Sequence, residues 1–373
     1  MRAIAYLIPA VLIVCCGCRK KSKPLLVLIS LYMWVLYAFN TNNGDFQVYY
    51  EIYSEVKQGR ELWHFEPAFA IIMRLCAGLG LDYIGFKAII GALQVGLLYK
   101  LFVKYSKAPA LAMALFLIFP FIYNVSVVRG GLAGLFVCYG FCGYSQGGRN
   151  AKAKYLFWVF LGTLFHYSSI VFALYVFVGK IQKPRKVFIG SAVASLVFSA
   201  AAFSGLAFRI MSIFTSRIKS LQWLSTALYA HLNATGVILV VFVFVANYWM
   251  SGICYKTIAE NAVLEDQKYE RLARMARAAN CAVFVALPFA VLSDVMLRYV
   301  FEFMAVNIAV YSTAAAMSTE RKSRAGVISV KNILAFLWVM FMFMYVTLPY
   351  LGTEISAFNT FYNNLLFGQK IPY

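Results

Sequence analysis

Arg129 is a positive charge at the start of an apolar segment, in the stretch Val127–Ala133, directly after another apolar run that ends at Asn124. No other strongly charged residue lies between Lys107 and Arg149. A cation at membrane depth is costly unless a fixed anion or an anionic substrate meets it. Two interpretations follow: Arg129 anchors the end of a helix, or it binds a phosphate group of a substrate.

Further ionisable residues stand at the ends or in the middle of apolar segments: Asp45, Glu66, His166 and Arg298. Asp45 and Glu66 belong to a polar stretch, residues 40–66, that also contains many aromatic residues. Carboxylates accept hydrogen bonds from hydroxyl groups and aromatic rings stack on sugar faces, so this stretch suits contact with a carbohydrate. The alternative for its tyrosines is an aromatic belt at the membrane interface, and the alternative for His166 is packing between helices.

The composition is that of a membrane protein. Of the 373 residues, 62% are hydrophobic, and apolar runs of roughly 15–20 residues alternate with short basic loops. We therefore expect an all-α, polytopic transmembrane helical protein with about ten spans plus re-entrant half-helices, built as a single integral membrane domain over residues 1–373. The net charge of +20 would also fit a nucleic-acid-binding protein. However, the basic residues cluster in loops, as the positive-inside rule requires, so we expect membrane lipids and no nucleic acid as partners.

Outer-face loops are predicted near residues 40–66, 204–236 and 350–373. The basic cluster Arg19–Lys23 follows the first apolar run and marks a cytoplasmic end, from which the other sides are counted. Arg217 belongs to the second outer loop, where apolar residues recur at the spacing of a helix that lies flat on the membrane.

Two apolar runs are expected to re-enter the membrane without crossing it. Residues 67–80 are too few to cross and carry Arg74 in their middle. Residues 155–179 lie between two basic loops that belong on one side, so we expect a turn near His166, with one long span as the alternative. Residues 111–124, in contrast, are expected to form one helix.

Several short motifs follow one another along the chain: Asp45 with Tyr49-Tyr50, Glu66-Pro67-Ala68-Phe69, Arg129-Gly130-Gly131-Leu132-Ala133, Phe165-His166-Tyr167-Ser168-Ser169, Arg298-Tyr299 and Phe361-Tyr362-Asn363. In this order and spacing they resemble the EpsG/Wzy-type polysaccharide (O-antigen or exopolysaccharide) polymerases over nearly the whole chain. The chain departs from that family at Gly130, where the family usually has glutamine. Any hydrogen bond of that glutamine is absent here or is supplied by another residue.

The resemblance implies a glycosyltransferase similar in plan to the GT-C class. Such a polymerase transfers a growing glycan chain from undecaprenyl diphosphate to the non-reducing end of another lipid-linked repeat unit, on the outer, periplasmic face of the bacterial inner membrane. Its partners would be undecaprenyl-diphosphate-linked oligosaccharides as donor and acceptor, together with membrane lipids. A chain-length regulator protein is a further candidate partner.

The lipid diphosphate of such a reaction needs cations, and arginine matches phosphate oxygens best. Arg129 and Arg298 are the leading candidates. Arg74 and Arg217 are weaker candidates, because both could be interfacial anchors. Glu302 follows Arg298 by one helical turn, so we expect these two residues to form an ion pair.

The attacking sugar hydroxyl needs a base or a strong acceptor, and three residues compete for that role: His166, Asp45 and Glu66. The candidate contacts to the glycan are Tyr49, Tyr50 and Tyr299. The chain contains no Asp-x-Asp sequence, and its eight cysteines form no metal-ligand spacing with histidine. We therefore expect transfer without a metal ion or another cofactor.

Other functions fit parts of the pattern. An O-antigen ligase-like transferase would also need outer arginines and a histidine, but it would carry a larger outer domain than residues 204–236. A membrane acyltransferase would need His166 on the cytoplasmic face. A flippase for lipid-linked sugars would show internal repeats and cations along a central cavity, whereas the cations here gather at one face.

Overall fold

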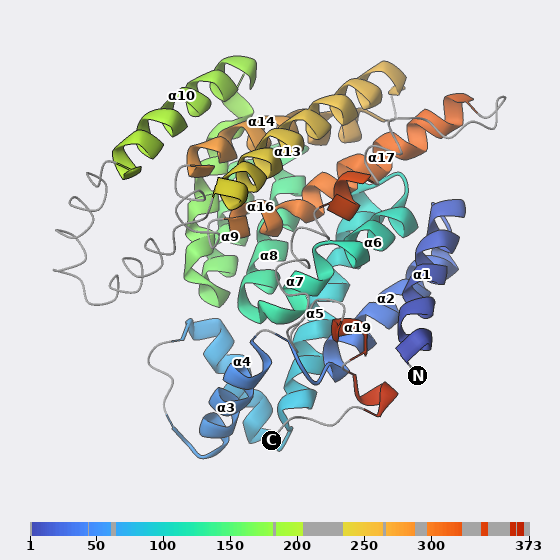
Figure 1. Cartoon of the computed structure of the whole chain (residues 1–373), viewed down its shortest axis with the longest axis vertical. Coiled ribbons are helices and arrows are strands. Elements are labelled where there is room, and N and C mark those ends of the chain that lie inside the picture. The colour runs from blue at the N-terminus through green and yellow to red at the C-terminus, as the bar shows by residue number, and fades with distance from the viewer. Residues whose placement is uncertain are drawn as a thin grey trace.

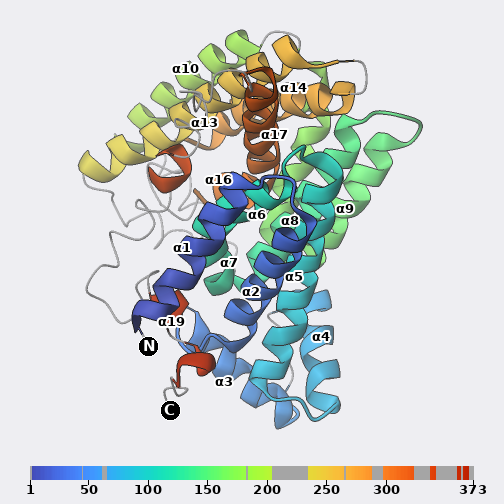
Figure 2. The ribbon, with the colours of Figure 1, turned by 90° about the vertical axis from the view of Figure 1, so that its right-hand side faces the viewer.

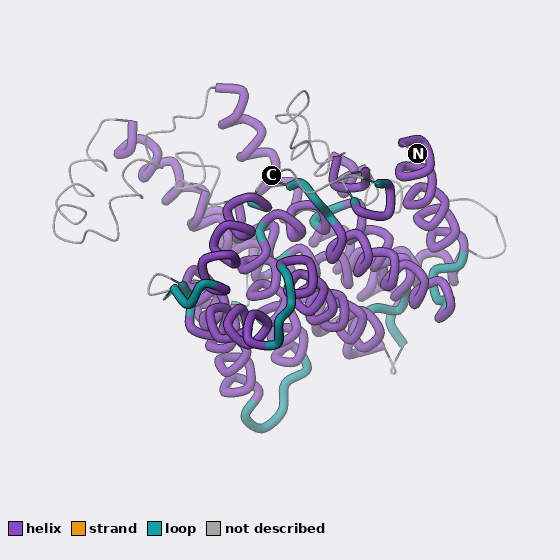
Figure 3. Tube along the Cα trace, turned by 90° about the horizontal axis from the view of Figure 1, so that it is seen from below, coloured by secondary structure: helices purple, strands orange, loops and turns teal. Residues whose placement is uncertain are grey.

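The computed structural model is helical throughout the residues that it describes (Figures 1 and 3). Those residues are 2–43, 45–60, 65–181, 184–203, 234–263, 266–287, 297–322, 337–341, 359–362 and 364–368. Arg217 and nearly all of the predicted outer loop 204–236 lie outside them, as does most of 350–373. The all-α prediction is confirmed for the described part of the chain.

The elements, with η marking 3-10 helices, are α1 (Arg2–Cys18), α2 (Lys23–Phe39), α3 (Phe46–Lys57), α4 (Pro67–Gly78), α5 (Tyr83–Tyr105), α6 (Pro109–Ile118), α7 (Phe121–Ser126), α8 (Val128–Ser145), α9 (Ala151–Phe165), η1 (Tyr167–Lys180), α10 (Pro184–Phe203), α13 (Ala234–Asn261), α14 (Gln267–Ala282), η4 (Val283–Ala286), α16 (Arg298–Glu302), α17 (Met304–Lys322), α19 (Asn359–Tyr362) and η7 (Leu365–Phe367).

Local sequence explains where several of these helices begin. The Ser22 hydroxyl accepts a hydrogen bond from the Leu25 backbone at the start of α2 (3.4 Å), and the Asp82 carboxylate does the same for Gly85 at the start of α5 (2.7 Å). These side chains satisfy backbone N–H groups that have no partner within the helix. Pro67 begins α4, because proline has no N–H to leave unsatisfied at a first helical position.

Helix α8 lies in the middle of the fold and packs against α5 on one side and α9 on the other (Figure 2). Small residues allow α9 to come close. A Cβ atom on Gly140 would lie 2.5 Å from Cβ of Trp158, and one on Gly162 would lie 3.0 Å from the Ala133 carbonyl oxygen. Close backbone approach through glycine is a common way for helices to associate in membranes.

Gly140→Ala is therefore expected to lower the melting temperature, because the new methyl group must push Trp158 and α9 away from α8. Overpacking of this kind costs about 1–3 kcal/mol. Gly96→Ala is the matched control, since a Cβ on Gly96 in α5 meets nothing within 4 Å, and alanine favours a helix over glycine. Thermal unfolding of both purified variants in one detergent checks the prediction. Equal melting temperatures would contradict it.

Basic loops meet at one end of the bundle. Lys107 in the α5–α6 loop forms an ion pair with Asp266 before α14 (2.9 Å), and Gln146 after α8 donates to the Lys268 carbonyl (3.2 Å). The turn between α1 and α2 is hydrogen-bonded to the start of α6 (3.1 Å). Arg129 lies in the first turn of α8 and Gln146 just beyond its last, so the two are separated by roughly 25 Å along the helix. The residues around Arg129 are thus remote from the basic loops.

The apolar run 155–179 is divided, as predicted. Helix α9 ends at Phe165, His166 has extended backbone, and η1 then runs back along α9. The Tyr155 hydroxyl donates to the Phe172 carbonyl across this hairpin (2.7 Å). Because the chain doubles back, the basic loops before α9 and after η1 lie on one side of the turn.

Other predicted elements were wrong. Residues 111–124 are not one helix, because α6 ends before Pro120, whose ring and missing N–H interrupt a helix. The stretch 40–66 is not wholly a loop either, because it contains α3, whose apolar face is buried.

The run 67–80, in contrast, forms the short helix α4, as its length suggested.

Among the described helices, α5 alone is long and apolar enough to cross a membrane by length and composition. Helices α1, α2, α4, α6, η1 and most of α17 are apolar but shorter. The helices are thus consistent with a membrane protein. The number of spans and the GT-C-like arrangement stay predictions.

Candidate active site

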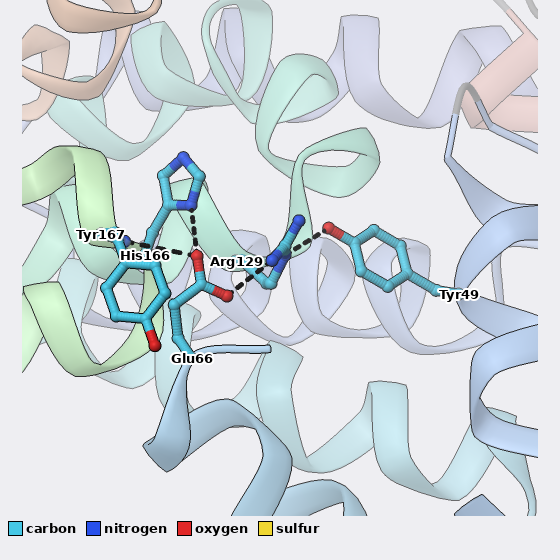
Figure 4. Close-up of polar contacts among 5 residues, drawn as sticks. All are labelled: Tyr49, Glu66, Arg129, His166 and Tyr167. Carbon is cyan, nitrogen blue, oxygen red and sulfur yellow. Dashed lines mark hydrogen bonds and ion pairs between the residues drawn. The ribbon is translucent and has the colours of Figure 1, made fainter. Parts of the chain in front are cut away.

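Glu66 is the centre of a buried polar group that draws residues from distant parts of the chain (Figure 4). One carboxylate oxygen, Oε2, forms an ion pair with Arg129 Nη1. The other, Oε1, lies 3.0 Å from His166 Nδ1 and accepts a hydrogen bond from the Tyr167 backbone N–H (3.3 Å). Only 4% of the Glu66 side chain is exposed, so a fixed anion and a fixed cation meet away from bulk water.

Each of these side chains is positioned by the end of a helix. Glu66 precedes Pro67 and is held in extended backbone, the conformation that proline imposes on the residue before it. His166 lies at the break between α9 and η1, and Arg129 lies in the first turn of α8. Packing of α4 and α8 against α9 brings the three together.

Arg129 has a second set of contacts on the side of α3. Its Nε donates to the Tyr49 hydroxyl (2.9 Å), and its guanidinium carbon lies 4.8 Å from the centre of the Phe65 ring. Nη2 has no hydrogen-bond partner among the described residues, and a quarter of the side chain is exposed. The fixed anion that this cation needs is therefore Glu66, and donor capacity is left for a ligand.

The proton on the His166 ring can be placed from these contacts. Burial by itself would raise the pKa of Glu66, but the hydrogen bond with His166 and the charge of Arg129 lower that pKa to about 2. Glu66 is thus a carboxylate, which only accepts hydrogen bonds. Nδ1 of His166 must therefore carry a proton, and in the neutral tautomer Nε2 has the lone pair.

Glu66 should contribute to stability in a defined pH range. Its pKa is about 2 in the folded protein and 4.5 ordinarily, so the unfolded chain binds the extra proton between these values. Its contribution, about 3 kcal/mol, is present above pH 4.5 and is lost as the pH falls towards 2. We expect the difference in melting temperature between wild type and Glu66→Gln to shrink over this range. Glu55→Gln, at an exposed ion pair, is the control, and a difference independent of pH would contradict the prediction.

Asp45 and Arg298 belong to the same neighbourhood. Burial raises the pKa of Asp45, while the charges of Arg298 and Arg129 act in the opposite direction, which requires both guanidinium groups to be near. Asp45 is held by its backbone N–H, which donates to the Asn43 side chain (3.2 Å). Asp45 is therefore an acid close to two arginines, and one of these, Arg129, is the residue that pairs with Glu66.

The other predicted site residues in the described part of the chain form no hydrogen bond or ion pair with Glu66, Arg129 or His166. Tyr50 packs edge-on against Tyr83, with ring centres 5.9 Å apart. Tyr299 packs edge-on against Phe172 (5.8 Å) near the η1 turn. The structure does not bring Arg74 to the site: its side chain lines a surface cavity of about 410 Å³ beside α3.

The predicted ion pair between Arg298 and Glu302 is wrong. No contact within 4.0 Å joins them, and Glu302 Oε2 is buried without a hydrogen-bond partner among the described residues. Phe65 and the Tyr167 backbone are site components that the sequence did not single out, because a stacking ring and a backbone N–H have no distinctive pattern. In the described part of the chain, no three His, Cys, Asp or Glu residues are grouped to hold a metal ion.

The described residues form a helical, largely apolar protein with a buried carboxylate–histidine–arginine group at the start of a central helix, which is consistent with a helical membrane protein. The model of the EpsG family matches residues 23–359, which is most of the chain. The protein belongs to the EpsG family. No curated protein and no solved structure matches it.

Proposed function

We propose that this protein is a polysaccharide polymerase, a membrane glycosyltransferase that moves a glycan chain from a lipid diphosphate carrier to a sugar hydroxyl of another lipid-linked repeat unit. The EpsG family suggests polymerase-like activity. The observation that supports the chemistry is the Glu66–His166 contact, which leaves a basic nitrogen in a site lined with arginine.

The proposed step is a single displacement. The acceptor hydroxyl loses its proton to Nε2 of His166, and its oxygen forms a bond to the anomeric carbon of the donor sugar. The bond between that carbon and the diphosphate oxygen breaks, and the lipid diphosphate leaves with both electrons. Glu66 stabilises the imidazolium that forms, because its carboxylate already accepts from Nδ1. Glu66 thus acts as a positioning residue and His166 as the base.

Negative charge develops on the departing diphosphate, and Arg129 with Arg298 would bind it. Arg129 keeps its Nη2 donors available while Glu66 and Tyr49 fix its plane. Preorganised donors in a site shielded from water stabilise developing charge strongly. Asp45, near both arginines, would accept a hydrogen bond from the glycan.

The placement of the site supports reaction on the outer face of the bacterial inner membrane. The basic loops, which the positive-inside rule assigns to the cytoplasm, gather at the far end of α8. The glycan carrier in such a setting is undecaprenyl diphosphate, and transfer needs no metal ion in this proposal.

The test is the glycan made by a host strain from which the gene has been deleted, with and without the wild-type chain. Gel electrophoresis should show a ladder of polymer with the chain and a single repeat without it. Repeat units that never reach the outer face in the deletion strain would indicate a flippase and contradict the proposal. A ladder that persists on the carrier lipid without the chain would indicate a ligase and contradict it as well.

A further inference from the structure

Glu302 is a second buried acid near this site, and one of its carboxyl oxygens has no hydrogen-bond partner in the described part of the chain. It is the last residue of α16 and is 5% exposed. The Cys138 thiol of α8 donates to its backbone carbonyl (3.0 Å), which fixes the end of α16 on α8. Its Oε2 has no hydrogen-bond partner among the described residues.

The glycines of α8 make room for this side chain. A Cβ on Gly134 would lie 2.8 Å from Cβ of Glu302, and one on Gly130 would lie 3.1 Å from Glu302 Oε1. Any side chain at these two positions would displace the carboxyl group. Glu302 therefore lies along a face of α8 that only glycine leaves open.

Gly130 also lies beside the Nε2 edge of the His166 ring. The Cβ position of Gly130 is also 3.5 Å from Cδ2 of His166, the ring carbon bonded to Nε2. Glu66 occupies the other edge of the ring, at Nδ1. The His166 ring thus has the Glu66 carboxylate at Nδ1, and Gly130 lies next to both its Cδ2 and the Glu302 carboxyl group.

A buried carboxyl oxygen without a partner destabilises a fold, because it has lost its water and gained nothing. Packing alone would be served better by an apolar side chain of the same size. A substrate hydroxyl bound beside the carboxyl group would supply the donor that Oε2 lacks, and the neighbouring His166 ring would offer it Nε2 as an acceptor.

We propose that Glu302 is a substrate-binding residue that holds the attacking sugar hydroxyl against the Nε2 edge of His166, beside Gly130. The inference rests on the proposed polymerase function. It assigns to Glu302 a hydrogen bond with the acceptor glycan, in addition to the roles of Arg129 and His166.

The test compares Glu302→Met and Glu302→Gln with wild type in the deletion strain, together with the melting temperature of each purified protein in detergent. Methionine fills the position of the glutamate without a polar group. The amount of polymer should therefore fall on the order of 100-fold, while the melting temperature stays equal or rises. Glutamine keeps an acceptor and should retain part of the activity. Gly130→Ala should also reduce polymer, because its methyl group would displace the Glu302 carboxyl group, and Gly96→Ala, whose methyl group meets nothing within 4 Å, should not.

Each outcome decides between distinct conclusions. If Glu302→Met lowers polymer and melting temperature together, Glu302 is a packing residue and the inference is overturned. If Glu302→Met makes a ladder at the wild-type level, the inference fails while the polymerase function stands. If the wild-type chain itself restores no ladder in the deletion strain, the proposed polymerase function is wrong, and the Glu302 inference falls with it.

Discussion

His166→Ala is expected to reduce polymer formation by about 100- to 10,000-fold, the usual contribution of a positioned base. The variant keeps Glu66 and Arg129 paired but removes the nitrogen that would accept the hydroxyl proton. His166→Gln should be equally inactive, because its amide can donate to Glu66 but cannot take up a proton. The measurement is the length and amount of the glycan ladder at matched protein levels in the membrane.

Tyr167→Ala is the control for His166. It lies next in the chain, its hydrogen bond to Glu66 comes from the backbone N–H, and the residue is 56% exposed. Alanine retains that backbone group, so the ladder should match wild type. A normal ladder from His166→Ala would limit this residue to packing and leave Asp45 as the candidate base, since both oxygens of Glu66 are occupied.

Arg129→Ala is expected to abolish the ladder and to destabilise the protein by about 3–5 kcal/mol, because it leaves the buried Glu66 carboxylate without its ion pair. Arg129→Lys should restore little of the polymer. A lysine can neutralise Glu66, but it cannot also keep the Tyr49 contact and present a planar pair of donors. Both effects are read from the ladder and from thermal unfolding.

Arg60→Ala is the matched control for this loss of charge. Arg60 pairs with Glu55 at 2.9 Å, but the two side chains are 64% and 47% exposed, and such surface pairs contribute about 0–1 kcal/mol. A double variant, Glu66→Gln with Arg129→Ala, measures the coupling of the buried pair. Full activity of Arg129→Lys would show that the residue acts only as a point charge.

Much of the helical pattern could be predicted from composition and charge. Apolar runs bounded by basic loops predict helices, and α1 ends at Cys18, directly before the basic cluster Arg19–Lys23 that was expected to follow it. The turn at His166 was also predictable, because two basic loops flank one apolar run. The break at Pro120 could have been found from the proline itself, since proline interrupts a helix interior.

The pairing of site residues could not be predicted in the same way. Arg298 and Glu302 have the spacing of an ion pair, yet α16 is only one turn long and Glu302 turns towards the glycines of α8. Arg74 follows Glu66 by two helical turns, yet it points to the surface beside α3. Side-chain direction depends on which helix packs against which face, and no local pattern contains that information.

The sequence by itself determined that the chain is helical and apolar, that basic residues gather in loops, and that Arg129 needs an anion. These properties follow from residue types, their periodicity and the cost of burying charge. Only the tertiary structure decided that the anion is Glu66, that Glu66 also binds His166, and that a carboxyl oxygen of Glu302 is buried without a hydrogen-bond partner among the described residues. Some of those contacts join segments that are 100 or more residues apart in the chain. The packing of helices brings those segments together.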